Sequence, residues 1–129
     1  MAFNPRPRVL YVDDHEDCGA MISALLTFSQ IETRVATNAA QALSLIKAEP
    51  FDLYLLEAWL PDVDGFELCR QMRDSNPATP ILFFSGAAYE ADKKRGLQAG
   101  ADAYVNKPDI QSLLGNISYY VSPALVATA

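Results

Sequence analysis

Four short apolar runs of this chain end near side chains that could do chemistry together. These are three carboxylates, a hydroxyl and an ammonium, from Asp13, Asp14, Glu57, Ser85 and Lys107. Three converging carboxylates cannot all stay charged without a cation, so they either bind a hard divalent metal or shift their pKa values. The hydroxyl and the ammonium add donors suited to the oxygens of a phosphoryl group. Together the residues predict a site for a metal and a phosphoryl group.

Magnesium suits these residues better than zinc. One or two carboxylates, a backbone carbonyl and several retained waters satisfy Mg²⁺, whereas zinc prefers His or Cys ligands. The only histidine, His15, follows the acidic pair directly and is expected to be an exposed first-turn residue. Mg²⁺ is therefore the expected cofactor.

Each motif also has a purely structural interpretation. An Asp-Asp pair after a strand often forms a turn and caps a helix, Ser-Gly is a turn signal, and Lys-Pro often marks an exposed strand end. Trp59 is expected to anchor its loop. Only the order of the motifs along the chain makes the functional interpretation specific.

The apolar runs predict the elements that position these residues. Runs of three to six residues, typical of short buried strands, alternate with segments of helical spacing. This alternation indicates an α/β fold with a doubly wound, five-stranded parallel sheet and five helices, whose ligands bind beyond the carboxyl ends of the strands. The expected strands are Val9–Val12, Ile31–Ala36, Leu53–Leu56, Ile81–Phe84 and Ala103–Val105.

The helical segments have recognisable starts and buried faces. The third helix is expected to begin near Gly65, the fourth to span about Tyr89 to Ala99, and the fifth to begin after Asp109 as its N-cap. In the first helix, the predicted inward face consists of Cys18, Met21, Ile22, Leu25 and Phe28.

Length and charge restrict the function further. The chain has 129 residues, enough for one domain, and its net charge of -6 argues against direct binding to nucleic acid. Cys18 and Cys69 have no metal-binding or disulfide spacing and are expected to be small buried hydrophobes. With no signal-peptide or membrane-spanning run apparent, a soluble cytoplasmic protein is predicted. The predicted organisation is an N-terminal extension at 1–7, a domain at 8–121 and a tail at 122–129.

Four motifs together resemble the receiver domain of bacterial two-component response regulators, similar to single-domain chemotaxis regulators. They are VLYVDD at 9–14, LLEAWLPDVDGFEL at 55–68, PILFFSG at 80–86 and AGADAYVNKP at 99–108. The resemblance implies a flavodoxin-like (βα)5 fold, no enzymatic role of its own, and a place in a phosphorelay.

It also implies the roles of individual residues. Asp14 is expected to bind magnesium directly and Asp13 mainly through water, with the backbone carbonyl of Trp59 completing the metal shell. Ser85 and Tyr104 are expected to be switch residues, and Lys107 to pair with the phosphoryl group. The Lys107–Pro108 peptide bond is expected to be cis.

Glu57 departs from the family pattern, because it lies where the family has its phosphoacceptor aspartate. The nearby Asp62 and Asp64 are interpreted as turn and capping residues. The additional methylene moves the carboxylate by about 1.5 Å, so weak or absent phosphorylation is predicted. Glu57 is also an expected residue of the metal site, with Asp13, Asp14 and Trp59. Three interpretations of the departure stay open: partial mimicry of the activated state, a phosphorylation-independent interaction module, and an engineered Asp-to-Glu change.

The resemblance also suggests partners. A sensor histidine kinase or phosphotransfer protein is expected upstream. A downstream protein, or a weak homodimer, is expected on the face formed by the fourth helix, fifth strand and fifth helix, around Lys93, Lys94, Tyr104 and Tyr119. An aspartate-based phosphohydrolase is disfavoured because the acidic pair is adjacent rather than DxD. A flavin carrier is disfavoured because the first loop is strongly anionic.

Overall fold

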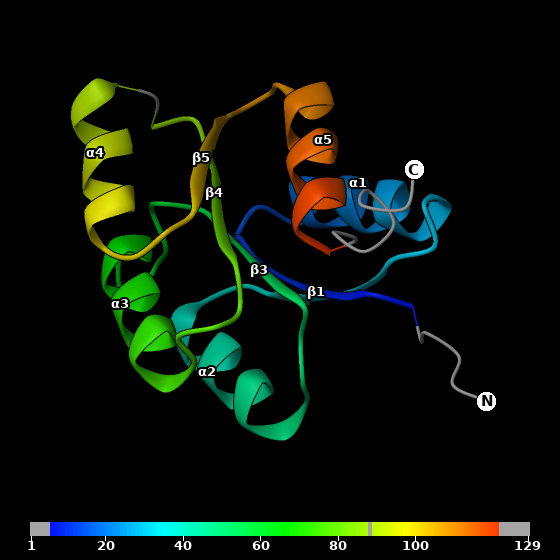
Figure 1. Ribbon diagram of the computed structural model, residues 1–129, viewed down its shortest axis with the longest axis horizontal. Coiled ribbons are helices and arrows are strands. Elements are labelled where there is room, and N and C mark those ends of the chain that lie inside the picture. The colour runs from blue at the N-terminus through cyan, green and yellow to red at the C-terminus, as the bar shows by residue number, and fades with distance from the viewer. Residues whose placement is uncertain (1–5, 88, 122–129) are drawn as a thin grey trace.

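Strands and helices alternate along the whole described part of the chain (Figure 1). The computed structural model describes residues 6–87 and 89–121. The predicted α/β fold with five parallel strands and five helices is confirmed. In chain order the elements are β1 (Arg8–Val12), α1 (Glu16–Phe28), β2 (Glu32–Ala36), α2 (Ala39–Ala48), β3 (Leu53–Leu56), α3 (Gly65–Ser75), β4 (Ile81–Ser85), α4 (Glu90–Gln98), β5 (Ala103–Asn106) and α5 (Ile110–Val121).

The strand order places the ends of four strands close together. The sheet has the order β2-β1-β3-β4-β5, and every neighbouring pair is parallel. From β1 the chain goes first to one side, to β2, and then to the other, to β3. The carboxyl ends of β1 and β3 therefore flank the switch point at which open α/β sheets bind ligands.

Helices cover both faces of the sheet. In Figure 1, α1 and α5 lie on one side and α2, α3 and α4 on the other. Each side has its own hydrophobic cluster, and the residues of β3 alternate between them: Leu53 and Leu55 pack toward α1 and α5, and Tyr54 and Leu56 toward the other three helices. All residues of β3 and β4 are buried, which explains why these strands are continuous apolar runs.

Aspartates fix the starts of three helices. The carboxylate of Asp64 accepts a hydrogen bond from the Glu67 amide at 2.8 Å and caps α3. Asp109 does the same for the Ser112 amide of α5 at 3.0 Å. Asp62 accepts hydrogen bonds from Ala39 and Ala40, in the first turn of α2. The prediction that Asp62 and Asp64 are turn and capping residues is confirmed.

The predicted inward face of α1 is partly wrong. Ile22 is buried, but Met21 is 42% exposed and Phe28 is 89% exposed. The buried residues of the helix are Gly19, Ile22 and Leu26, and α1 comes so close to β2 at Gly19 that a methyl group there would lie 3.1 Å from Val35. This side of the helix packs on the sheet, and the side with Met21 and Phe28 does not. Cys18 is only partly buried.

The predicted terminal segments lie largely beyond the part of the chain that the structure describes. Residues 1–5 of the extension and all of the tail, 122–129, are outside it. Among the described helices, none has both the length and the apolar character needed to cross a membrane.

Candidate functional site

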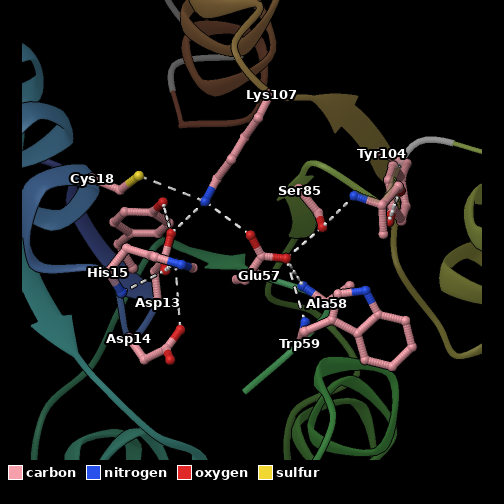
Figure 2. Close-up of polar contacts among 12 residues, drawn as sticks. Asp13, Asp14, His15, Cys18, Glu57, Ala58, Trp59, Ser85, Tyr104 and Lys107 are labelled. Carbon is pink, nitrogen blue, oxygen red and sulfur yellow. Dashed lines mark hydrogen bonds and ion pairs between the residues drawn. The ribbon is translucent and has the colours of Figure 1, made fainter. Parts of the chain in front are cut away.

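The polar residues singled out in the sequence meet at the carboxyl ends of the central strands (Figure 2). Asp13 follows β1, Glu57 follows β3, Ser85 ends β4 and Lys107 follows β5. Asp13 and Ser85 are fully buried, and Glu57 is 5% exposed. Burying polar groups at this density requires that each find a partner.

Lys107 links two of the carboxylates. Its Nζ lies 2.6 Å from Oδ2 of Asp13 and 2.8 Å from Oε1 of Glu57. Burial alone would lower the pKa of Lys107, but the hydrogen bonds to Asp13 and Glu57 outweigh it and raise the pKa above its ordinary value. Lys107 is therefore a permanent cation between two buried anions. The Lys107–Pro108 peptide bond is cis, as the resemblance implies.

Asp13 is held by groups on both of its oxygens. Oδ2 accepts from the hydroxyl of Tyr11 as well as from Lys107, and Oδ1 accepts from the backbone amide of His15 at 2.9 Å. Burial would raise the pKa of Asp13, but these hydrogen bonds together lower it below the usual value. Asp13 is thus an ionised, fixed carboxylate.

Glu57 curls back over the loop that follows it. Its Oε2 accepts hydrogen bonds from the backbone amide of Ala58 at 2.6 Å, from that of Trp59 at 3.3 Å, and from the hydroxyl of Ser85. With Lys107 on Oε1, both oxygens of the carboxylate are engaged by protein donors. The additional methylene of glutamate gives the side chain the reach for this arrangement.

Gly65 keeps the Glu57 loop tight. A methyl group there would overlap the carbonyl oxygen of Glu57, and the Gly65 amide donates to the carbonyl of Ala58 at 2.7 Å. Trp59 lies in this loop, 53% exposed, and packs edge-on against Phe66 with ring centroids 6.0 Å apart. The packing agrees with its predicted role as a loop anchor.

The two predicted switch residues both point toward Ala87, in the loop after β4. The Ala87 amide donates to Oγ of Ser85 at 3.0 Å, and the hydroxyl of Tyr104 donates to the Ala87 carbonyl. The half-buried Tyr104 ring stacks on Phe83, with centroids 5.2 Å apart and an interplanar angle of 18°. Glu57, Ser85, Ala87 and Tyr104 therefore form one hydrogen-bonded series from the site to the surface (Figure 2).

The described residues include one group of potential metal donors, Asp13, Asp14 and His15, whose donor atoms all lie within 4.8 Å of one another. Asp14 is 40% exposed, and the His15 ring lies 2.9 Å from Asp13 and 3.5 Å from Asp14. The two carboxylates fit a hard divalent cation such as Mg²⁺. Glu57 is not a member of this group, because its oxygens contact Lys107, Ser85 and the loop amides.

The predicted partner face carries exposed side chains of mixed character. Lys94 is exposed, Lys93 is partly buried, and Tyr119 is 60% exposed. Tyr89 and Leu97 on the same side are 82% and 50% exposed. These residues belong to α4, its N-cap and α5.

Tyr11 is the site residue that sequence reasoning missed. It is fully buried, and burial together with its hydrogen bond to Asp13 raises its pKa far above the ordinary value. A signal was available, because residues two apart on a strand face the same side. Tyr11 and Asp13 have that spacing, and a phenol within the apolar run Val9–Val12 needs a hydrogen-bond partner.

A family model agrees with this geometry. The model described as "Response regulator receiver domain" matches residues 9–118.

Individual relatives and solved structures point the same way. The chain is 34% identical to the response regulator ArlR of Staphylococcus epidermidis over 110 residues, which are 84% of this chain and 50% of ArlR. It is 36% identical to the alkaline phosphatase synthesis transcriptional regulatory protein PhoP of Bacillus subtilis over 101 residues, 78% of this chain and 42% of PhoP. A CheY-like receiver domain protein of Methanospirillum hungatei superposes with a TM-score of 0.86 at 31% identity, covering 92% of this chain and 95% of the other. The chain spans about half the length of the curated relatives it matches.

Proposed function

The chain belongs to the response regulator receiver domain family, and from this we propose that it is a phosphorelay receiver in which Glu57 stands at the phosphoacceptor position. Receiver domains of this family are signalling modules, not enzymes. The proposed domain spans residues 8–121, and the proposed location is the cytoplasm. We further propose that the chain is poorly or not phosphorylated, and partly active-like without a phosphoryl group.

The observation that carries the proposal is that protein donors already contact both oxygens of the Glu57 carboxylate. Its carboxylate contacts Lys107 and Ser85, the two residues whose donors would hold the oxygens of a phosphoryl group. A phosphoryl group attached here would need the same donors. Phosphorylation would therefore first have to break the contacts that hold the nucleophile.

The longer side chain of Glu57 should slow phosphoryl transfer further. An added methylene shifts the carboxylate by about 1.5 Å relative to aspartate. Misplacement of reacting atoms by about 1 Å can cost on the order of a hundredfold in rate. Lys107, Ser85 and the metal, which are placed for an aspartyl phosphate, would therefore act on the wrong phosphorus position.

The same contacts support a partly active-like state. Ser85 contacts the Glu57 carboxylate, and Tyr104 reaches inward to the Ala87 carbonyl. Outward positions of these two side chains would have contradicted activated-state mimicry. The mimicry is partial, because a carboxylate carries a charge of -1 and two oxygens, against about -1.5 to -2 and three oxygens on a phosphoryl group.

Asp13, Asp14 and the backbone carbonyl of Trp59 are the proposed magnesium ligands. Mg²⁺ there would neutralise the acidic pair. Glu57 is proposed as a further ligand, but its two oxygens already contact Lys107 and Ser85, so we assign the ion mainly to the acidic pair. The His15 ring lies beside both aspartates.

The proposed partners are a sensor histidine kinase or phosphotransfer protein upstream and a protein target downstream. The target, or a second copy in a weak dimer, would bind the face of α4, β5 and α5. Direct binding to nucleic acid is not proposed for this domain, because its chain carries a net charge of -6. The alternative function is a phosphorylation-independent interaction module, favoured by the hydrogen bonds of Ser85 to Glu57 and of Tyr104 to Ala87, which involve protein groups alone.

The test is incubation with a small-molecule phosphodonor and Mg²⁺, followed by intact mass. Wild type, Glu57→Asp and the control Glu49→Asp are compared, since Glu49 pairs with Arg8 at the opposite end of the sheet. We expect a gain of one phosphoryl mass in Glu57→Asp alone. Equal phosphorylation of wild type would overturn the proposal, and no gain in any variant would favour the interaction module.

A further inference from the structure

Tyr104 fits its inward position only because α4 has no side chain opposite it. Gly96 is buried within α4 and faces the Tyr104 ring. A methyl group on Gly96 would lie 2.8 Å from Cδ2 and 3.1 Å from Cε2 of Tyr104. Optimal separations between non-bonded carbons are about 3.5–4.0 Å, so even alanine is too large for the space.

The backbone does not explain this glycine. Among the described glycines, only Gly100 has a positive φ, so the conformation of Gly96 is one that any residue adopts. A glycine within a helix is otherwise unfavourable relative to alanine. The space taken by Tyr104, the nearest group, and by Phe83 is the local reason for Gly96.

Of the groups around Gly96, Tyr104 is the one able to move. Phe83, whose Cδ2 would lie 3.1 Å from the added methyl, is fully buried and stacked between Phe66 and Tyr104. The Gly96 carbonyl accepts from the Ala101 amide at 3.1 Å, which ties the helix end to the loop before β5. Tyr104 is half-buried on the edge strand β5, so its ring can rotate toward solvent.

We propose that Gly96 is a positioning residue for Tyr104, a notch in α4 that admits the ring and so makes the inward state accessible. The notch acts from the helix side, whereas Glu57 acts through Ser85 and Ala87 from the site side. The signalling meaning of the inward state rests on the proposed function, but the steric argument does not. Without the notch, Tyr104 would add its ring to the exposed α4, β5 and α5 face.

The experiment compares Gly96→Ala with Gly115→Ala. Gly115 is also within a helix, α5, but a methyl group there has no atom within 4 Å. Both changes replace a helical glycine by alanine, but only the methyl group at position 96 would meet Tyr104. In NMR spectra with labelled aromatic rings, we expect Gly96→Ala to lose the cross-peaks between Tyr104 and Phe83, and Gly115→Ala to retain them. Retention of these cross-peaks at full intensity in Gly96→Ala would overturn the proposal.

A second comparison, of stability, tests the proposal if the Gly96→Ala protein folds too poorly for NMR. Gly96→Ala should lower the urea midpoint when Tyr104 is present. In a Tyr104→Ala background only the 3.1 Å contact with Phe83 remains, so the same change should lower the midpoint less. An equal loss with and without the Tyr104 ring would assign the clash to Phe83 or the backbone and refute the notch. Phosphorylation of wild type would refute the proposed function while leaving both results interpretable.

Discussion

Oε1 of Glu57 and Nζ of Lys107 lie 2.8 Å apart, and only 6% and 17% of these side chains are exposed. Lys107 also contacts Asp13, so one ammonium serves two buried carboxylates. This unequal charge balance makes Lys107 the residue on which the electrostatics of the site depend. A divalent cation at the acidic pair would relieve the same imbalance.

Replacing Lys107 by Met should destabilise the protein by about 3 kcal/mol, because breaking a buried ion pair leaves uncompensated charge. The loss should shrink in millimolar Mg²⁺, because a cation at the acidic pair would compensate the charge of Asp13. Urea denaturation with and without Mg²⁺ measures both effects. Lys94→Met, at an exposed position of α4, is the control and should change stability little. A Lys107→Met protein as stable as wild type without Mg²⁺ would contradict the assigned role.

Removing the hydroxyl of Tyr11 should cost about 1–2 kcal/mol, because Asp13 loses a buried donor while the aromatic packing stays. Since that hydrogen bond helps to lower the pKa of Asp13, Tyr11→Phe should also shift the acid unfolding transition to higher pH. Chemical denaturation across pH 3–7 tests this. Tyr119→Phe, on an exposed ring, is the control. Identical acid transitions for wild type and Tyr11→Phe would show that Asp13 does not depend on the phenol.

The fold was predictable because the central strands are largely continuous apolar runs, and strand ends in a parallel sheet necessarily converge. The placement of Asp13, Glu57, Ser85 and Lys107 at one edge follows from this. The prediction of a buried strand at Ile31–Ala36 is wrong in part, because β2 lies at the edge of the sheet and most of its residues are exposed or only partly buried. The curled conformation of Glu57 was not predictable, because its partners Ala58 and Trp59 contribute backbone amides that every residue has.

The inward face of α1 was mispredicted for a related reason. Helical spacing alone allows several apolar faces of α1. The face that packs on the sheet is the one on which Gly19 lies close to Val35. The need for glycine at position 96 was unpredictable in the same way, because it arises from the Tyr104 ring, eight positions later in the chain. Long-range contacts of small residues leave little trace in hydrophobic periodicity.

The two cysteines should differ sharply in reactivity. Cys69 is fully buried, and burial raises the pKa of its thiol to about 11, whereas Cys18 is partly exposed, 3.7 Å from Lys107. Iodoacetamide at pH 8 should therefore label Cys18 in the native protein, and Cys69 at least about tenfold more slowly. Peptide mass mapping after timed quenching measures the two rates. Labelling of both thiols at equal rates without denaturant would contradict the buried position of Cys69.

Asp62 should stabilise the protein only while it is ionised. Burial opposes its charge, but the backbone amides of Ala39, Ala40 and Val63 together outweigh it and lower the pKa of Asp62. A carboxyl whose folded pKa is depressed contributes stability above its unfolded pKa, about 3.9, and loses it as the pH falls through the folded value.

Asp62→Ala should therefore cost about 1 kcal/mol at pH 7, because two first-turn amides of α2 lose their acceptor while Asn38 still caps the helix. The difference from wild type should shrink below about pH 4. Urea midpoints at pH 7, 5 and 3 measure the trend, and Asp74→Ala, in the last turn of α3, is the control for removing an aspartate. A difference that stays constant from pH 7 to pH 3 would mean that the ionised carboxylate is not what holds the start of α2.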